Sequence, residues 1–512
     1  MLALAVTLTA CGGGSPDPAR QGNAAPAPDG GLAEAQRASV LRAMAGAAAP
    51  EQSGQYQNVC AAPRVPDSTH PYYPDRQGTL DDEKTFLRRW SDETYLWHNE
   101  IPAADPAAYA TAPAYFDVLK TPQLTVAGKP KDRYHYSYGS AEYEELARGV
   151  ELGYGLTFVR NPAPNIPRNW RIAAVAPGSP AARAGLRRGD RLEQVDGLDF
   201  IWASDASALA VLNGGLFPKN SDAQHSLLFT RGRQQLAVSM LPVKVDVPPV
   251  QHVRVYNAPP GKVGYLVFNS HNAVSEMQLI EAFNTLKQAK VNDLVLDMRY
   301  NGGGLLVIAS ELAYMIAGDK PTAGKMFQWL KNNGKRPPET PLIFLPLSLG
   351  LFAPNPAPYL KPLPTLNLSH VTILTGPGTC SASEALINGL RGVDVEVTLI
   401  GGATCGKPYA FVPMPNCGTT YFTVQYQGVN HKGFGDYGDG FAPTCAVRDD
   451  LAHALGDPRE ALLAKAFSYR GTGGCQVDPD GIRIRAGGAV PEPPPDLVPV
   501  RHPVSEIAIR GW

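Results

Sequence analysis

Short apolar runs that alternate with polar residues follow one another between residues 149 and 245. Five runs have the length and the β-branched or aromatic content of strands, at 154–159, 170–175, 191–195, 226–231 and 236–241. Ser179-Pro180 opens a short helix between the second and third runs, and Gly185 ends it. The pattern therefore predicts a small, mostly β domain over residues 149–245.

Strand-like and helix-like patterns alternate over residues 246–475. Strands are expected at 263–268, 293–298, 371–375 and 395–401, and amphipathic helices at 275–290, 305–316 and 383–390. This order is typical of an α/β domain. A proline-rich stretch at 337–364 interrupts it and is expected to be a surface loop.

The chain ends differ in character from the middle. Residues 12–55 are rich in Ala, Gly, Pro and Gln and predict a flexible linker, with a helix over 32–47. Aromatic and charged residues at helical spacing predict a small helical cap domain over 56–148, with its aromatic rings in a core. Residues 476–512 predict a proline-rich C-terminal tail.

Composition narrows the class of protein. A chain of 512 residues with 44% hydrophobic content is long enough for two or three domains. Lys plus Arg (46) nearly balance Asp plus Glu (47), so nucleic acid is not an expected partner. The chain has no Cys-x-x-Cys and no His-Glu-x-x-His, so neither a metal nor another cofactor is expected.

Residues 1–11 form a short apolar run that ends at Cys11. The run resembles a bacterial lipoprotein signal, which implies lipidation of Cys11, attachment to a membrane through the lipid, and a place in the cell envelope, on an outer membrane facing the periplasm. No Lys or Arg precedes the run, and an incidental apolar N-terminus is the alternative. The other six cysteines form an even set that suits disulfides in an exported protein.

The most informative serine, Ser381, lies between a predicted strand and a predicted helix. Helix N-terminal N–H groups stabilise developing negative charge there, but serine needs a neighbouring base. Lys407 follows the next predicted strand, and burial would lower the pKa of a lysine from roughly 10.4 towards neutrality. We therefore predict Ser381 as nucleophile and Lys407 as base, with the N–H groups of Gly303 and Ala382 as oxyanion donors.

Residues 178–197, which read GSPAARAGLRRGDRLEQVDG, resemble a PDZ domain. The resemblance implies that a peptide is added as a strand, with its C-terminal carboxylate held by backbone amides of an apolar loop. That loop is formed by Gly155, Leu156, Thr157 and Phe158. The alternative is a rigid spacer or gate whose groove stays empty.

Three motifs in this order behind a PDZ-like domain resemble the S41 peptidases, the tail-specific or C-terminal processing proteases. They are Arg-Tyr-Asn-Gly-Gly-Gly at 299–304, Ser-Ala-Ser-Glu at 381–384 and Gly-Lys at 406–407. The resemblance implies an α/β catalytic domain with crotonase-like ββα units and a Ser381–Lys407 dyad. That dyad would cleave peptide bonds in exported or misfolded proteins. It also implies that Glu384 supports the lysine. Phe411 stands where many members carry a glutamine that orients the lysine.

Each of these assignments has an alternative. Ser381 could cap a helix, Lys407 could be a solvated charge, and Glu384 could be an ordinary first-turn carboxylate. His271 is expected to be structural. The motifs Gly-x-Ser-x-Gly and Ser-x-x-Lys are missing, which disfavours α/β-hydrolases and penicillin-binding proteins. A catalytically inactive PDZ adaptor lipoprotein that binds peptide C-termini is the alternative function.

Two cysteines adjoin the predicted catalytic pair. Cys380 precedes the nucleophile and Cys405 lies two residues before the base, so a bridge between them would fix the two catalytic loops together. Six cysteines allow fifteen pairings, and two small buried thiols are the alternative.

Overall fold

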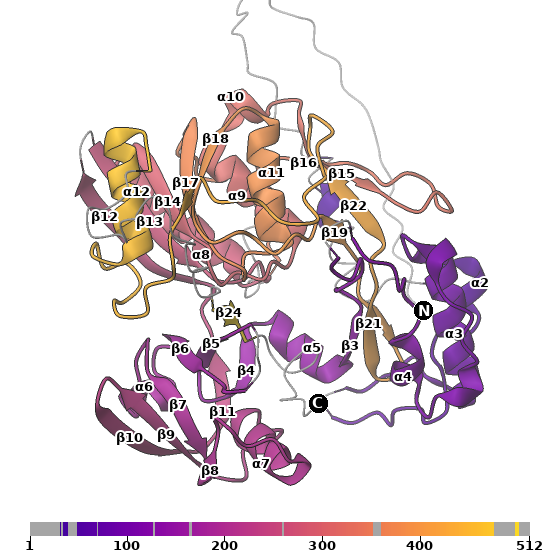
Figure 1. The fold of residues 1–512 in the computed structure, drawn as a ribbon. Coiled ribbons are helices and arrows are strands. Elements are labelled where there is room, and N and C mark those ends of the chain that lie inside the picture. The colour runs from indigo at the N-terminus through magenta and orange to yellow at the C-terminus, as the bar shows by residue number, and fades with distance from the viewer. Residues whose placement is uncertain are drawn as a thin grey trace, which may run out of the picture.

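The structure is a computed structural model that describes residues 31, 34–38, 49–68, 70–125, 128–162, 166–258, 261–351, 360–475 and 497–500. Figure 1 shows an α/β lobe, a smaller β lobe below it and a helical lobe at the side. The predicted signal with Cys11 lies outside the described residues. Within the described ranges no helix combines the length and the apolarity needed to cross a bilayer.

A six-stranded sheet forms the centre of the α/β lobe. Its order is β12-β13-β14-β17-β18-β23, and all neighbours are parallel except the antiparallel pair β12–β13. The strands are β12 Val250–Ala258, β13 Gly261–Phe268, β14 Asp293–Asp297, β17 His370–Thr375, β18 Glu396–Gly401 and β23 Cys445–Ala446. The carboxyl ends of the parallel strands meet at one edge, where loops can gather functional side chains.

Helices cover both faces of this sheet, as Figure 1 shows. Leu294 and Leu296 of β14 face a core shared with α8 (Ser275–Gln288), α9 (Leu306–Ala317) and α11 (Ala382–Gly392). Val295 faces the opposite core, which α12 (Ala461–Thr472) completes. Burial on both faces explains why the central strands read as continuous apolar runs. The predicted α/β class is confirmed, and the predicted elements reappear within a few residues of their expected ends.

The proline-rich stretch at 337–364 is not the surface loop that its composition predicts. It contributes the short strand β16 (Leu342–Ile343), and Leu345 and Leu349 are fully buried in the core beneath α9. The buried carboxylate of Glu276 accepts N–H groups from Leu349, Gly350 and Leu351. Leucine side chains between the prolines therefore pack inward, and three backbone N–H groups of the stretch donate to one buried carboxyl group. Residues 352–359 lie outside the described residues.

The β lobe has the strand order β10-β9-β7-β6-β5-β24, with β8 on β7. Its elements are β5 Leu156–Arg160, β6 Trp170–Val175, α6 Pro180–Arg183, β7 Arg191–Val195, β8 Leu198–Asp199, α7 Ala206–Leu216, β9 His225–Arg231 and β10 Gln234–Met240. The edge strand β24 (Val498–Pro499) comes from the predicted tail. At residues 497–500, therefore, the tail is part of a folded lobe.

The helical lobe contains α2 Glu51–Gly54, α3 Leu80–Thr94, α4 Ala112–Phe116 and α5 Ser140–Ala147. It also holds the strands β1 Val59–Cys60, β2 Arg76–Gln77 and β3 Tyr136–Gly139. Strand β3 pairs with β21 (Thr419–Phe422), which pairs with β20 (Met414–Asn416), and a disulfide joins Cys60 to Cys417. Late segments of the chain thus complete this lobe, which is not closed by residues 56–148 alone.

Smaller elements connect the lobes. Strand β4 (Val150–Gly153) pairs with β11 (Val243–Asp246) where the chain enters and leaves the β lobe. A second sheet has the order β16-β15-β22-β19, with β15 Met326–Lys331, β22 Tyr426–Val429 and β19 Tyr409–Ala410. Short helical turns lie at η1 His98–Glu100, η2 Pro106–Ala108 and α10 Asp319–Thr322.

Part of the predicted flexible linker is ordered. Residues 34–38 are helical, within the helix expected over 32–47. Gln36 is buried and its side chain donates to the Pro341 carbonyl, while Arg37 Nε donates to the Leu349 carbonyl at 2.6 Å. These contacts with a distant segment explain why a run without its own core still has a defined place.

A buried ionic cluster joins the β lobe to the end of β14. The Arg299 guanidinium is bonded to Asp297, Glu460 and Asp449, and Arg188 of the β lobe reaches Asp449 and the Tyr300 hydroxyl. Burial opposes the charge of Arg299, but the surrounding carboxylates hold its pKa well above the usual value. Because Asn301 follows directly, the cluster fixes the backbone that leads into the glycine run.

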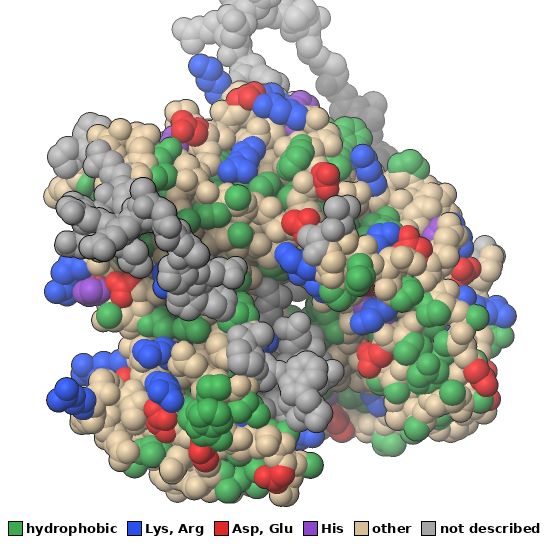
Figure 2. All heavy atoms as spheres, viewed as in Figure 1, with side chains coloured by type: hydrophobic (Ala, Val, Ile, Leu, Met, Phe, Trp, Pro, Cys, Tyr) green, Lys and Arg blue, Asp and Glu red, His purple; other side chains and the backbone are tan. Residues whose placement is uncertain are grey.

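Charges on the face drawn in Figure 2 are mixed in sign, with Lys and Arg interspersed among Asp and Glu. This distribution offers no single basic tract on that face for a polyanion. It agrees with the near balance of the whole sequence.

Candidate active site

A cavity of about 2030 Å³ opens between the three lobes. Ser381, Lys407 and Gly303 all line it, together with Tyr134 of the helical lobe and Pro499 of β24. The structure therefore brings the predicted nucleophile, base and glycine run to one solvent-reached space. A space of this size can admit an extended peptide segment.

Ser381 lies at the N-terminus of α11 with an unusual backbone conformation. Its φ is 58° and its ψ is −115°, a region in which a side chain is strained. The turn is held from behind, because the Cys380 N–H donates to the Asn301 carbonyl and the Thr379 hydroxyl donates to the Met298 carbonyl. Strain of this kind concentrates at functional sites.

We expect Ser381→Gly to be more stable than Ser381→Ala, although neither can act as a nucleophile. Glycine removes a backbone strain of about 1–3 kcal/mol. It also lowers the free energy of unfolding by roughly 0.4–1 kcal/mol, because the unfolded chain has more conformational freedom. The net increase in the free energy of unfolding is about 1 kcal/mol. Urea unfolding of the two full-length variants measures the difference. A glycine variant that unfolds at lower urea than the alanine variant would contradict a strained turn.

Glu384, in the first turn of α11, accepts hydrogen bonds from both predicted catalytic loops. Its carboxylate accepts the N–H of Ser381 at 3.0 Å, the N–H of Lys407 at 2.7 Å, the N–H of Gly406 at 2.8 Å and the Thr404 hydroxyl at 2.6 Å. The side chain is fully buried, and burial raises the pKa of Glu384 against the opposing effect of these donors. Glu384 thus supports the backbone of Lys407.

Lys407 is almost fully buried among aromatic rings. Its Nζ lies 4.0 Å from the centre of the Phe411 ring and 5.0 Å from that of Tyr134. The Tyr134 hydroxyl donates to the Gly406 carbonyl at 2.8 Å, so the helical lobe supplies a wall of the lysine pocket. Phe411, at the position where the sequence resemblance led us to expect glutamine, lies with its ring against the amine.

The glycine run lies directly against the nucleophile. A Cβ on Gly303, whose φ is +100°, would stand 2.7 Å from Ser381 Cβ and 2.9 Å from the Ala382 nitrogen. One predicted donor is already engaged, however, because the Gly303 N–H donates to Asn301 Oδ1 at 2.9 Å. Gly303 thus makes room for a carbonyl beside Ser381, and in this conformation its amide is bonded to the Asn301 side chain. The role of Gly303 as an oxyanion donor stays a prediction.

His271 lies behind the glycine run and is structural in its contacts. Its backbone bonds to Gly303 and Leu305, and its Nδ1 lies 3.1 Å from Asn301 Oδ1. Burial lowers the pKa of His271 to about 3, so the ring is neutral at ordinary pH. Asn301 and His271 together hold the glycine backbone.

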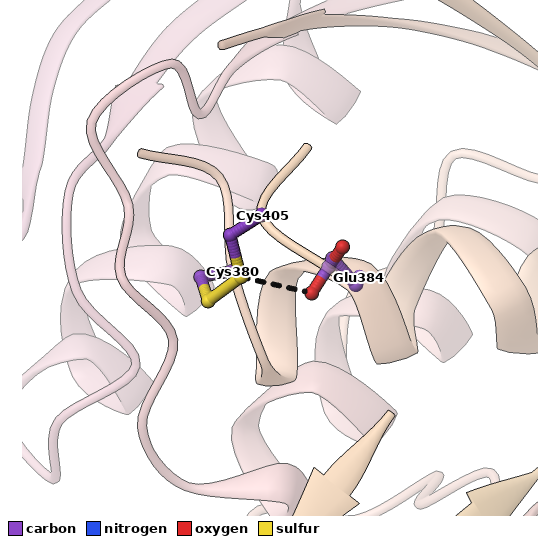
Figure 3. Close-up of side chains that lie close together, drawn as sticks. All are labelled: Cys380, Glu384 and Cys405. Carbon is purple, nitrogen blue, oxygen red and sulfur yellow. Dashed lines mark hydrogen bonds between the residues drawn. A yellow bond between two sulfur atoms is a disulfide. The ribbon is translucent and has the colours of Figure 1, made fainter. Parts of the chain in front are cut away.

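Cys380 and Cys405 form a disulfide, with a Cα–Cα distance of 5.2 Å. Figure 3 shows the bridge beside Glu384, whose Oε2 lies 3.3 Å from Cys405 Sγ. The bridge joins the nucleophile loop to the base loop as the sequence predicts. The three side chains also converge closely enough for a metal ion, but sulfurs joined to each other offer no thiolate.

The predicted peptide loop leads into β5, which lies between β6 and β24 in the sheet. Gly155 has a φ of +75° and packs under Ser179, where a Cβ would stand 2.3 Å from the serine Cβ. Leu156, Thr157 and Phe158 lie in β5 itself, and β6 pairs with one edge of that strand. The other edge of β5 pairs with β24.

Several supporting residues were not found from the sequence. Asn301, Thr404 and Tyr134 all orient the catalytic loops through hydrogen bonds. Asn301 lies inside the Arg-Tyr-Asn-Gly motif, which was a usable signal. Nothing in the sequence around Tyr134 indicates that its hydroxyl reaches a loop more than 270 residues later.

Known proteins resemble this chain in sequence and in fold. Residues 262–433 match peptidase family S41, and residues 171–212 match a PDZ domain. The chain is 28% identical over 273 residues to a carboxyl-terminal-processing protease of Synechocystis, covering 51% of this chain and 53% of that protein. It is 28% identical over 170 residues to the chloroplastic carboxyl-terminal-processing peptidase 2 of Arabidopsis thaliana, covering 32% and 31%.

The chain spans about half the length of the curated relatives it matches most extensively. Among solved structures, a candidate S41 protease from Bacteroides fragilis superposes with a TM-score of 0.56 at 24% identity, covering 80% of this chain and 99% of that one. This similarity shows a shared fold. The resemblance drawn from the three sequence motifs and from the PDZ-like segment is confirmed.

Proposed function

We propose that this chain, which carries a peptidase family S41 domain behind a PDZ domain, is a serine endopeptidase that works through Ser381 and Lys407. The observation that supports the proposal is the set of hydrogen bonds that Glu384 accepts. One buried carboxylate bonds the backbone of Ser381 and of Lys407, so both residues face the same cavity.

In the proposed reaction, Ser381 Oγ attacks the carbonyl carbon of a peptide bond and its proton passes to Lys407 Nζ. The Ala382 N–H at the start of α11 stabilises the oxyanion. Lys407 then gives the proton to the leaving amine. Water, deprotonated by Lys407, hydrolyses the acyl-enzyme and restores Ser381.

The substrates that fit this arrangement are extended or unfolded polypeptides of exported proteins. The PDZ loop at 155–158 is proposed to select them by their C-termini, so that binding energy gathered there positions a bond elsewhere in the chain. The lipid anchor at Cys11 and the place in the cell envelope remain predictions.

The purified protein should cleave unfolded proteins at internal peptide bonds, and Ser381→Ala should not. The test compares both proteins on peptide substrates made with free and with amidated C-termini, with products identified by mass spectrometry. We expect free C-termini to be cleaved more efficiently. Equal cleavage of the two forms would remove C-terminal recognition, and no cleavage by either protein would favour the inactive PDZ adaptor.

A further inference from the structure

Residues 498–500 pair with the edge of β5 that faces away from β6. Strand β24 pairs antiparallel with β5, with Val498 opposite Arg160 and Pro499 opposite Val159. The Val500 N–H donates to the Phe158 carbonyl at 2.8 Å. Figure 1 shows β24 beside β5, between the β lobe and the α/β lobe.

The direction of this strand matches that of a bound peptide. From residue 498 to residue 500, β24 runs past Arg160 and Phe158 towards Gly155. A substrate whose C-terminus entered the loop at 155–158 would run the same way along the same edge. One strand edge offers one set of N–H and C=O groups, so the two segments cannot bind together.

The side chains of this segment contact two lobes at once. Val500 packs against the apolar core of the PDZ lobe. Pro499 lies over Gly378, since a Cβ on that glycine would stand 2.5 Å from the proline Cγ. Because Val500 donates to β5, the nitrogen of Pro499 points away from the ladder, where its missing N–H costs no hydrogen bond.

Gly378 lies three residues before Ser381, and Val498 and Pro499 line the same cavity as the catalytic pair. The segment therefore lies along a route that would lead a substrate from the PDZ edge to the nucleophile.

We propose that residues 498–500 are a resident ligand of the PDZ groove, and that this groove binds extended segments in which a proline stands between two branched aliphatic residues. Substrates must displace the segment to use the groove. The statement that substrates compete with this segment rests on the proposed function. The binding of residues 498–500 in the groove does not.

A tethered ligand competes strongly even when its own affinity is low. At an effective concentration of about 1 mM, a segment with a Kd of about 0.1 mM weakens the binding of a free peptide roughly 10-fold. Release of the segment should therefore strengthen the binding of a free peptide by the same factor.

The test measures fluorescence anisotropy of a labelled, amidated peptide with the sequence of residues 496–502, Asp-Leu-Val-Pro-Val-Arg-His. Every protein is the full chain carrying Ser381→Ala, so the peptide is not cut. Val500→Glu places a charge against the PDZ core and releases the segment, and Val500→Ser is a milder release variant. Val253→Glu, on the half-exposed edge strand β12, is the matched control. Thermal unfolding checks that each variant is folded.

We expect both release variants to bind the peptide about 10-fold more tightly than the parent and the Val253→Glu control. Equal affinities in all four proteins would overturn the proposal, and so would an absence of binding in all four, because an emptied groove must accept its own segment. The assay measures peptide binding to proteins that lack the nucleophile. Its outcome is therefore independent of the cleavage test, and either test can fail while the other succeeds.

Discussion

Lys407→Ala is expected to lower kcat/KM for peptide cleavage by about 10⁴-fold, because Ser381 then has no base to take its proton. Residues that act as one unit are not additive, so the double variant with Ser381→Ala should be hardly less active than either single variant. The variant should fold, because Glu384 bonds the backbone N–H of residue 407, which alanine retains. Initial rates on a fluorogenic peptide measure the loss.

The matched control is Lys432→Ala, which removes a half-exposed lysine paired with Asp394 and should leave the rate unchanged. A serine-reactive fluorophosphonate gives a second reading, since Ser381 should be labelled far more slowly without Lys407. A Lys407→Ala protein that keeps a tenth of the wild-type rate, or is labelled at the wild-type rate, would exclude the dyad.

Arg299→Leu should cost about 3–5 kcal/mol of unfolding free energy, the largest stability loss we predict. The substitution leaves the carboxylates of Asp297 and Glu460 buried without their counter-ion. It also removes one of the two arginines, Arg299 and Arg188, that lower the pKa of Asp449 against the opposing effect of burial. Urea midpoints followed by tryptophan fluorescence report the change.

Arg459→Leu serves as the comparison, because Arg459 is 76% exposed and pairs with Asp457 at the surface. An exposed pair of this kind contributes little to stability. If Arg299→Leu and Arg459→Leu unfolded at the same urea concentration, the buried cluster would have no special role in holding the end of β14.

Local patterns predicted the elements of this chain well. The runs at 293–298 and 371–375 read as buried strands, and they form β14 and β17. Ser381 and Lys407 could be paired because their motifs resemble a known family. Periodicity alone would not have brought them into one cavity.

Pairings between distant segments could not be predicted in the same way. The tail residues 498–500 look like part of a disordered run, yet they add to the PDZ sheet. The stretch 337–364 has the composition of a loop, but its leucines reach a core built by other elements. The hydrogen bond from the Gly303 amide to the Asn301 side chain was not predicted either, because residue spacing does not indicate such a contact.

Strands β3 and β21 pair although they lie far apart in the sequence, so the helical lobe cannot be completed until both have been synthesised. The core of the helical lobe includes Tyr421 and Val424, and the Cys60–Cys417 bridge spans 357 residues. At synthesis rates of about 5–20 residues per second, the early half of that lobe waits about 20–70 s for its partner. The Tyr134 hydroxyl donates to the Gly406 carbonyl, so this wall of the lysine pocket cannot form until a segment 272 residues later has been synthesised. A nascent chain therefore lacks both the complete helical lobe and the enclosed lysine pocket until residues 406–424 have been made.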